Sequence, residues 1–539
     1  MELRRHDQKV AADLRAAESF PADQRAWRSR STPIQPAKPF RSVVENPSPL
    51  AKLARTAALL LACGLRLSAA PTSSATTLFP APGAAHVCPD TPLKLTFASA
   101  PALGMTGKIQ VFDADTRMVV ETIDVSSPTA TKTIGGFPDF KYYPVIITGR
   151  EAAIYLKNGA LTYDKTYYVT IDPGVFKTDA GSDPGLADAA AWRFTTRRAA
   201  PAAGRAVLNV AADGTGDFCS VQGALDFIPD GNTAPVTILV HRGTYNEIVA
   251  FTDKHSITLL GEDRRQTVIA YANNANFNAS GGNPFAGTSP NPSAATKQGG
   301  SIYHRGMFLA QHVNDLTIAN LTMRNTTKQG GSQAETIILN GTTEARAIIK
   351  DVDFYSFQDT IQINGQAFVS NCYIEGDVDF MWGTGPCFFE NCTAHTVRSS
   401  AFYTQIRNPG TNHGYVYRLC TFDGAPGITG NYLSRIAPGR FPASEVVLLD
   451  CTLGASVAPA GWLLEKNPSA PNDPVTPAGI HFWEFHSHTA DGSPVEAAQR
   501  LPGSVQLKQP DDAALIRDYS DPAFVLGHGW NPRLAPIFQ

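Results

Sequence analysis

The chain has 539 residues, a formal net charge of −3 and only 17% charged residues. This length exceeds one typical domain, so we expect at least two. The absence of a basic excess gives no reason to expect nucleic-acid binding. No apolar run reaches about 18 residues, the length that predicts a membrane span.

Residues 1–50 are polar, rich in Arg and Pro, and without apolar periodicity, so we expect an extension that is disordered or not translated. Residues 51–70 have the layout of a secretory signal peptide, with basic, apolar and small residues in order. We therefore expect translation to begin near Val43 or Val44 and the protein to be secreted, into the extracellular space or the periplasm. Leu60-Leu-Ala-Cys63 also resembles a lipobox, and lipid anchoring at Cys63 is the less favoured alternative.

Residues 76–197 hold short runs of strand-forming residues separated by turn residues, which predicts a β-sandwich. The segment resembles bacterial immunoglobulin-like domains in Leu161-Thr-Tyr-Asp-Lys-Thr-Tyr-Tyr-Val169 and in its final Trp192-Arg-Phe-Thr-Thr196. It contains no catalytic cluster, so we expect a spacer or carbohydrate-contacting role. Residues 198–205 are the expected linker.

From residue 206 a short step recurs after apolar runs: a polar residue, an apolar or small residue, then Thr, Tyr or Asp. The step recurs at intervals of 20 to 31 residues, beginning at Asn320, Asp351, Asn371, Asn391, Leu419 and Asp450. Short β-rich runs on a fixed step with variable insertions predict a solenoid. We therefore predict an all-β protein in which residues 206–535 form a right-handed parallel β-helix behind the immunoglobulin-like sandwich.

Cysteines also follow the repeat. Four of them share one repeat position, so we expect them to stack inside the coils: Cys372, Cys392, Cys420 and Cys451. The spacing of neighbouring coils would permit a disulfide, but we favour an apolar ladder of reduced thiols. None of the cysteines has metal-ligand spacing such as C-x-x-C, so we expect no metal.

Two aspartates, Asp359 and Asp379, are twenty residues apart, and each lies eight residues after a repeat position. In a β-helix they would occupy the same angular position on neighbouring coils, roughly 5 Å apart. A close carboxylate pair can keep one member protonated while the other is ionised. The pair therefore predicts an acid and a nucleophile in one site.

Several boxes resemble the pectin methylesterase family, carbohydrate esterase family 8, over roughly residues 206–535. Any one box is weak, but their order and spacing are specific. They are Val210-Ala-Ala-Asp-Gly-Thr-Gly-Asp-Phe218, Gly243-Thr-Tyr-Asn-Glu247, Leu316-Thr-Ile-Ala-Asn-Leu-Thr-Met-Arg-Asn325, Gln333-Ala334, Gln358-Asp-Thr360, Asp379-Phe-Met-Trp-Gly383 and Gly461-Trp462.

The resemblance implies hydrolysis of galacturonate methyl esters in pectin, a methylated homogalacturonan, to methanol and pectate, without a cofactor. It implies Asp379 as the nucleophile and Asp359 as the general acid and then base. It also implies Gln333 and Gln358 as oxyanion donors, and Arg435 as the residue that holds Asp379 ionised. We expect a monomer.

One box departs from the family pattern. The usual L-G-R-P-W reads Leu433-Ser-Arg-Ile-Ala437 here, so the substrate-stacking Trp is missing. Arg440 is a rival for the role of Arg435. Trp382, at a family Phe position, is the candidate that replaces the stacking surface. Three further aromatic residues are candidates for lining the groove, although core packing is the interpretation we favour for each: Tyr355, Phe357 and Tyr403.

Other interpretations compete with this one. Gly330-Gly-Ser-Gln-Ala334 faintly resembles a serine nucleophile elbow but lacks the strand-to-helix context. His486 and His488 lie on one face of a predicted strand, where a metal pair would need a third ligand. The alternative functions are another pectin-active β-helix enzyme, of polygalacturonase or pectate lyase type, and an inactive polysaccharide-binding solenoid.

Overall fold

The computed structural model describes residues 73–278, 304–341, 345–467, 470–472 and 475–538, which all belong to one compact unit, Ala69–Gln539. The predicted N-terminal extension, the signal peptide and Cys63 lie outside the described residues. Within the described part, no helix has the length and apolar character needed to cross a membrane.

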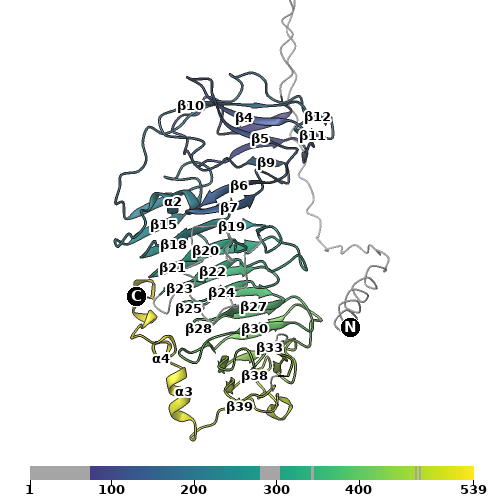
Figure 1. Cartoon of the computed structure of the whole chain (residues 1–539), viewed down its shortest axis with the longest axis vertical. Coiled ribbons are helices and arrows are strands. Elements are labelled where there is room, and N and C mark those ends of the chain that lie inside the picture. Colours follow the sequence, from purple (N-terminus) through teal and green to yellow (C-terminus); the bar gives the residue numbers. More distant parts are fainter. Residues whose placement is uncertain (1–72, 279–303, 342–344, 468–469, 473–474, 539) are drawn as a thin grey trace, which may run out of the picture. The chain divides into compact units, whose positions relative to one another are not determined.

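The N-terminal part is an antiparallel sandwich (Figure 1). One sheet has the order β1-β2-β9-β8, from Ala75–Phe79, Leu93–Phe97, Glu151–Ile154 and Val145–Thr148. The other has the order β13-β10-β4-β5, from Arg193–Thr195, Thr166–Ile171, Lys108–Asp113 and Val119–Asp124. Buried and exposed residues alternate along β2 and β10, as expected for strands with one face on a core. A small third sheet joins β12 (Gly181–Ser182), β11 (Phe176–Thr178) and β3 (Ala102–Leu103).

A hairpin from the predicted sandwich segment packs with the second domain instead. It consists of β6 (Ala130–Ile134) and β7 (Phe137–Tyr142), and four of its side chains join the core of the β-helix: Ile134, Phe137, Phe140 and Tyr142. Lys141 N donates to Asn278 Oδ1 at 2.7 Å, and Asn278 Nδ2 donates to Lys141 O at 3.1 Å. A Cβ at Gly135 would lie 1.8 Å from Ala250 O, so the turn approaches this closely because it has glycine there.

The second part is a parallel β-helix, whose strands are stacked from the teal to the green region of Figure 1. Each central coil contributes three strands, two to a long sheet and one to a shorter sheet. The long sheet of the described chain contains β14 (Val207–Val210), β15 (Val236–Val240), β16 (Gly243–Asn246), β18 (Ile257–Gly261), β19 (Thr267–Tyr271), β21 (Leu316–Asn325), β23 (Arg346–Tyr355), β25 (Gln366–Ser370), β26 (Tyr373–Gly376), β28 (Cys387–Glu390), β29 (Thr393–Thr396), β31 (Tyr415–Arg418), β32 (Thr421–Gly424), β34 (Glu445–Leu449), β35 (Thr452–Leu453), β37 (His481–Phe485), β38 (His488–Thr489) and β39 (Val505–Gln506).

The shorter sheet carries the candidate site. Its order is β17 (Val249–Thr252), β20 (Phe308–Gln311), β22 (Ile337–Asn340), β24 (Ile361–Ile363), β27 (Val378–Gly383), β30 (Phe402–Ile406), β33 (Tyr432–Ile436) and β36 (Trp462–Leu464). The predicted fold class, a parallel β-helix behind an immunoglobulin-like sandwich, is confirmed.

The predicted repeat positions have a common backbone conformation. All six have φ between 52° and 58°: Asn320, Asp351, Asn371, Asn391, Leu419 and Asp450. Asn and Asp tolerate this left-handed region better than other residues with a side chain, which explains why they recur at the step. The repeat in the sequence therefore marks one left-handed bend of the long sheet, which lies inside β21 and β23 at Asn320 and Asp351 and between strands at the other four positions. Leu419 is the exception.

The four repeat cysteines stack inside the coils as predicted, and the structure holds them as buried free thiols. Cys392 N, for example, donates to Cys420 Sγ at 3.4 Å. Helix α2 (Val221–Phe227) lies in the first coil. The C-terminal segment contains α3 (Ala513–Tyr519), α4 (Pro522–Leu526) and the short 3-10 helices η2 (Ala497–Gln499), η3 (Pro532–Leu534) and η4 (Pro536–Phe538). Residues from α3 and α4 cover side chains on the outer face of the long sheet.

Candidate active site

Three carboxyl groups share one register position on three successive coils. Ile337 pairs with Ile361, and Ile361 with Met381, so Glu335, Asp359 and Asp379, each two residues earlier, are aligned. Asp359 N donates to Val378 O at 3.0 Å, which joins the last two coils directly. The structure confirms the predicted alignment of Asp359 and Asp379 on neighbouring coils. Both residues have positive φ, 64° and 48°.

Asp379 is held by the guanidinium group of Arg435, which lies on β33. Arg435 Nε donates to Asp379 Oδ1 at 2.9 Å, and Nη2 donates to Oδ2 at 2.6 Å. The third nitrogen, Nη1, donates to Glu465 Oε1 at 3.1 Å. Such a bidentate pair fixes the plane of the carboxylate as well as its position. Burial alone would lower the pKa of Arg435, but its bonds to Asp379 and the negative charge of that carboxylate raise it.

Arg440, the rival arginine, does not make this pair; its guanidinium lies 5.1 Å from the ring of Phe441. The choice between the two arginines is therefore made by the register of β33, which places the side chain of Arg435 beside Asp379.

Asp359 has a different environment. Arg305 Nη2 lies 3.2 Å from Asp359 Oδ2 and 2.5 Å from Glu335 Oε1, so one guanidinium bridges two carboxyl groups. Burial raises the pKa of Asp359 well above its usual range, and the nearby Glu335 carboxyl raises it further, while Arg305 opposes both. Burial likewise raises the pKa of Glu335. Asp359 therefore keeps its proton to a higher pH than an ordinary carboxyl group.

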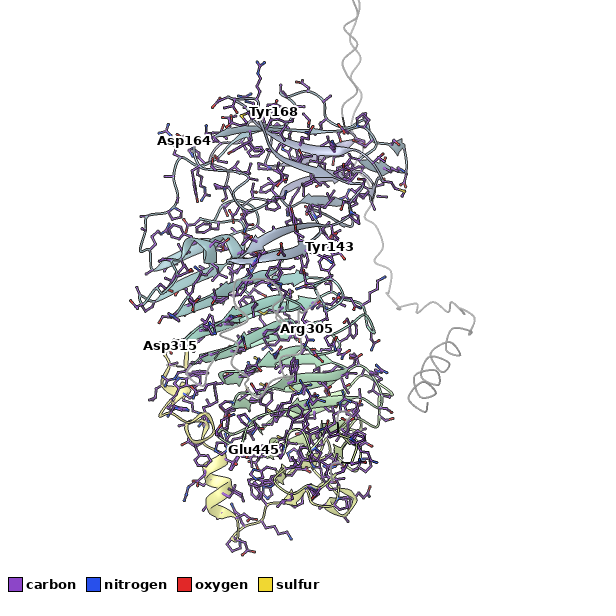
Figure 2. The ribbon with its side chains drawn as sticks, viewed as in Figure 1. Tyr143, Asp164, Tyr168, Arg305, Asp315 and Glu445 are labelled. Carbon is purple, nitrogen blue, oxygen red and sulfur yellow. The ribbon has the colours of Figure 1, made fainter. Side chains whose placement is uncertain are left out.

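The sequence reasoning missed Glu335 and Arg305. A signal for Glu335 exists, because it precedes Asp359 by 24 residues, close to one coil, and follows Gln333 by two. Arg305 (labelled in Figure 2) is not indicated by any local sequence pattern. Its guanidinium reaches Asp359 from the coil that precedes the coil of Glu335. Arg407 was also missed; burial lowers its pKa to about 10, against the opposing charges of Asp379 and Asp359.

The two predicted glutamines flank Asp359. Gln358 directly precedes it, and Gln333 lies on the preceding coil, where Ala334 N donates to Gln358 O at 3.0 Å. Both side chains are half-buried. Ser332 Oγ donates to Gln333 Oε1 at 3.0 Å, so the hydroxyl of the weak serine elbow motif orients this amide.

The predicted groove aromatics do not all face a groove. Tyr403 is fully buried, with its hydroxyl donating to Asp423 O at 2.6 Å, so the prediction that it lines the groove is wrong and it packs inside the coils. Trp382 is only 3% exposed, with guanidinium carbons at 5.5 Å (Arg305) and 4.7 Å (Arg407) from its ring. Its indole lowers the pKa of the Glu335 carboxyl group, against the larger effect of burial.

Tyr355 and Phe357 are half-buried. Tyr355 lies on the long sheet, where the guanidinium of Arg324 is 4.0 Å from its ring and Tyr373 packs at 5.4 Å. Tyr355 thus belongs to a stacked group on a sheet other than the one that carries the carboxyl groups.

Two aromatic residues that were not predicted lie beside Asp379. The ring of Phe402 is 4.3 Å from the guanidinium carbon of Arg435, and Tyr432 stacks on Phe402 with centroids 6.0 Å apart. Both rings are half-buried. They provide an aromatic surface beside Arg435.

The predicted histidine pair gains no third ligand among the described residues, where the candidate metal-ligating cluster is Cys88, Asp90 and Cys219. His486 Nδ1 lies 3.4 Å from Asp450 Oδ1, and its side chain is exposed. His486 lies between β37 and β38 with a φ of 53°, so the prediction that His486 and His488 share one strand face is wrong.

The fold and the carboxyl column define a β-helix protein with an acid pair on one sheet. A family model described as pectinesterase matches residues 207–502, and one described as a bacterial Ig-like domain matches residues 68–196. The chain belongs to the pectinesterase family.

Among curated relatives, Pectinesterase 2 of Olea europaea is 30% identical over 287 residues, which cover 52% of this chain and 70% of that protein. Pectinesterase 31 of Arabidopsis thaliana is 30% identical over 259 residues, which cover 48% and 76%. Among solved structures, pectin methylesterase from carrot is 20% identical with a TM-score of 0.47, covering 62% of this chain and 96% of that one. PemA from Erwinia chrysanthemi is 22% identical with a TM-score of 0.44, covering 62% and 100%.

Proposed function

We propose that this protein is a secreted pectin methylesterase that hydrolyses galacturonate methyl esters to methanol and pectate. The observation that carries the proposal is a pair of aspartates in one register with opposite environments. Asp379 is held in a bidentate ion pair, and Asp359 is buried beside a second carboxyl group that favours its protonated form. Family membership supplies the reaction class.

In the first half of the reaction, the Asp379 carboxylate attacks the ester carbonyl carbon. A carboxylate is a weak nucleophile, so its position must be fixed, and the two bonds from Arg435 do this. As the carbon–oxygen bond to the methoxy group breaks, Asp359 gives its proton to the leaving oxygen and methanol departs. The product is an acyl anhydride on Asp379 and an ionised Asp359.

In the second half, Asp359 accepts a proton from water, and the resulting hydroxide attacks the acyl carbon. The anhydride bond breaks, which releases the Asp379 carboxylate and a galacturonic acid carboxyl group that then loses its proton to bulk water. Asp359 is protonated again, so the cycle closes without a net proton on the enzyme. Its raised pKa suits both directions of this transfer.

We assign the negative oxygen of each tetrahedral intermediate to the side-chain amides of Gln333 and Gln358, which flank Asp359 on neighbouring coils. Neutral amides can donate hydrogen bonds to this oxygen without a positive charge that would favour ionisation of Asp359. Losing one such donor typically costs about 10²–10³ in rate.

Phe402 and Tyr432 are candidates for the sugar-stacking surface, because their half-buried rings lie beside Arg435. Pectin is a polymer outside the cell, so this function requires export, in agreement with the signal-like segment at residues 51–70. We infer a monomer, because the proposed reaction uses groups from a single chain.

The test is methanol release from highly methylated pectin, with Asp379→Asn as the diagnostic variant. This substitution removes the nucleophilic charge at nearly constant volume, so methanol release should fall to background while circular dichroism is unchanged. The matched control is Asp351→Asn, which lies at a repeat position where Asn occurs on the next coil, Asn371, and it should keep full activity.

Three readouts separate the rival functions. Methanol indicates an esterase, new reducing ends a hydrolase of the main chain, and unsaturated products a lyase. Undiminished methanol release from Asp379→Asn would exclude the proposed nucleophile. Pectin binding without any of the three products would indicate an inactive solenoid.

A further inference from the structure

Two cysteines from different domains meet where the sandwich joins the β-helix. Cys88 lies between β1 and β2 of the sandwich, and Cys219 directly precedes Ser220, the N-cap of α2 in the first coil. Their sulfur atoms lie within 4.8 Å of one another. Both side chains are buried, with exposures of 0% and 3%.

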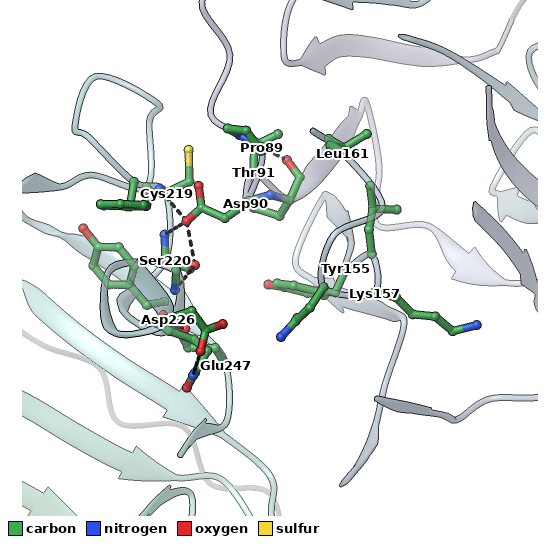
Figure 3. Close-up of a pocket in the computed structure, with 18 of the residues that line it drawn as sticks. Pro89, Asp90, Thr91, Tyr155, Lys157, Leu161, Cys219, Ser220, Asp226 and Glu247 are labelled. Atoms are coloured by element: carbon green, nitrogen blue, oxygen red, sulfur yellow. Dashed lines mark hydrogen bonds between the residues drawn. The ribbon is translucent and has the colours of Figure 1, made fainter. Parts of the chain in front are cut away.

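The backbone on both sides of the pair is fixed by contacts across the junction. Asp90 Oδ2 accepts hydrogen bonds from Cys219 N at 2.9 Å, Ser220 N at 2.8 Å and Ser220 Oγ at 2.7 Å (Figure 3). The guanidinium of Arg197 donates to three carbonyl oxygens, at 3.0–3.1 Å, of His86, Asp217 and Gly214. These contacts tie the segment around Cys88 to the segment around Cys219, so they keep the two sulfur atoms close to one another.

We propose that Cys88 and Cys219 form a disulfide in the exported protein, so that the sandwich is covalently tied to the β-helix. Each thiol loses a proton and an electron and one sulfur–sulfur bond forms, while the disulfide of a thiol–disulfide oxidoreductase or of glutathione accepts two electrons and becomes two thiols. Bonded sulfurs are about 2.05 Å apart, so the side chains must rotate toward each other. The proposal rests on the export inferred above.

The surroundings also indicate when the bond forms. The hydrogen bond with Cys88 and burial both raise the pKa of Cys219, and the Asp90 carboxyl adds to this. The thiolate, which is the attacking species in exchange, is therefore disfavoured once the junction has closed. The bond should form before the domains dock, and the same burial then shields it from reductants.

A metal ion is the rival occupant of the same sulfurs, because the Asp90 carboxylate lies within 4.8 Å of both. Asp90 Oδ2 is already committed to three donors, so only the buried Oδ1 remains for a metal, and we favour the disulfide. Two thiolates and one carboxylate also leave a tetrahedral site one ligand short.

Peptide mapping tests the proposal without any substitution. The protein is directed to a bacterial periplasm, denatured without reductant, alkylated and digested with trypsin. The peptide that ends at Lys94 contains Cys88, and the peptide 206–242 contains Cys219 as its single cysteine. We expect the two peptides to be linked, and separated by a reductant. Recovery of both cysteines as alkylated thiols overturns the proposal, as does about one bound zinc per chain in the same sample.

A second experiment tests the tie between domains. A protease site is inserted between Ala202 and Ala203, which are exposed in the linker. After cleavage the two fragments should migrate together on a denaturing gel and separate only with reductant. Cys88→Ala or Cys219→Ala should abolish the joined band, whereas Cys387→Ala, a buried cysteine inside the coils, should keep it. Methanol release on the same samples reports on the esterase independently, and it should persist in Cys88→Ala.

Discussion

At the scale of single residues, the site depends on two aspartates, Asp359 and Asp379. They occupy the same position on neighbouring coils, but their side chains have different neighbours. Arg435 contacts Asp379 through two nitrogens, whereas Asp359 shares Arg305 with a third carboxyl group, Glu335. In the proposed reaction, these differences in charge and burial divide the roles of nucleophile and acid between the two aspartates. Glu335 is buried, with 0% exposure, and its carboxyl group meets the guanidinium of Arg305 and the indole of Trp382. We therefore treat Glu335 as a positioning residue that acts through its neighbours.

The pH dependence of activity follows from Glu335. The Glu335→Gln substitution removes a carboxyl group that raises the pKa of Asp359. The positive charge of Arg305 is then no longer shared between Asp359 and a second carboxyl group. The pKa of Asp359 should fall, so its protonated form should be lost at a lower pH. We expect the alkaline limb of the kcat/KM profile for methanol release to shift to lower pH, with less change at the acidic end. An unshifted limb would contradict the assignment of Asp359 as the acid.

The pH dependence of stability follows from Asp359 itself. Its pKa is higher in the folded protein than in the unfolded chain, so the folded state binds the proton more tightly. The free energy of unfolding should fall as the pH rises through this raised pKa. Asp359→Asn should therefore have a higher urea midpoint than the wild type at alkaline pH, and the difference should shrink as the pH falls. A constant difference would indicate packing rather than titration.

At the scale of the element, the coil repeat is a left-handed turn, and Leu419 is the residue that fits it least. Its φ is 54° and its side chain is 44% exposed. The left-handed conformation costs an ordinary L-residue about 1–2 kcal/mol, and Asn less. Leu419→Asn should therefore stabilise the protein by about 0.5–1 kcal/mol, measured by urea unfolding. Leu419→Ala removes the same side chain without the preference of Asn, so it should give no comparable gain; equal gains would point to lost surface hydrophobicity instead.

The left-handed turn of the coil repeat explains which features of the fold and the site could be predicted from the sequence. Asn320, Asp351 and Asn371 mark turns whose conformation depends on the residue itself, so their positions could be read from the chain. The alignment of Asp359 with Asp379 followed because both lie at a fixed distance from such a turn. Glu335 was missed because its interval of 24 residues includes an insertion that changes the coil length. Tyr403 was misplaced because composition does not tell which face of a strand is buried.

At the scale of the molecule, the hairpin β6–β7 ties the sandwich segment to the β-helix, because its buried side chains belong to the core of the β-helix. Phe140 is fully buried and packs 4.3 Å from His304, the neighbour of the site residue Arg305. Tyr143 N (labelled in Figure 2) donates to Tyr271 OH at 2.7 Å. The sandwich segment therefore covers the apolar beginning of the β-helix and supports the strand that leads into the site.

This role predicts unequal effects for two buried phenylalanines. Phe140→Ala should destabilise the β-helix by about 3–5 kcal/mol, the usual cost for a buried Phe. Phe176→Ala removes an equally buried ring from the sandwich core. In heat-inactivation curves of methanol release, Phe140→Ala should lower the midpoint more than Phe176→Ala. Equal midpoints would mean that the two cores unfold together and that the hairpin has no special role.

The sequence alone determined the solenoid, the sandwich and the shared register of Asp359 and Asp379, because strand periodicity, turn chemistry and coil length are local properties of the chain. The arginine expected beside Asp379 came from the resemblance to the family. Only the tertiary structure decided that Glu335 and Arg305 lie beside Asp359 and that Tyr403 points into the coils. It also decided that the hairpin β6–β7 of the sandwich segment packs in the core of the β-helix, and that Cys88 lies close to Cys219. Those encounters join residues far apart in the chain, and they depend on how each insertion folds back onto the coils.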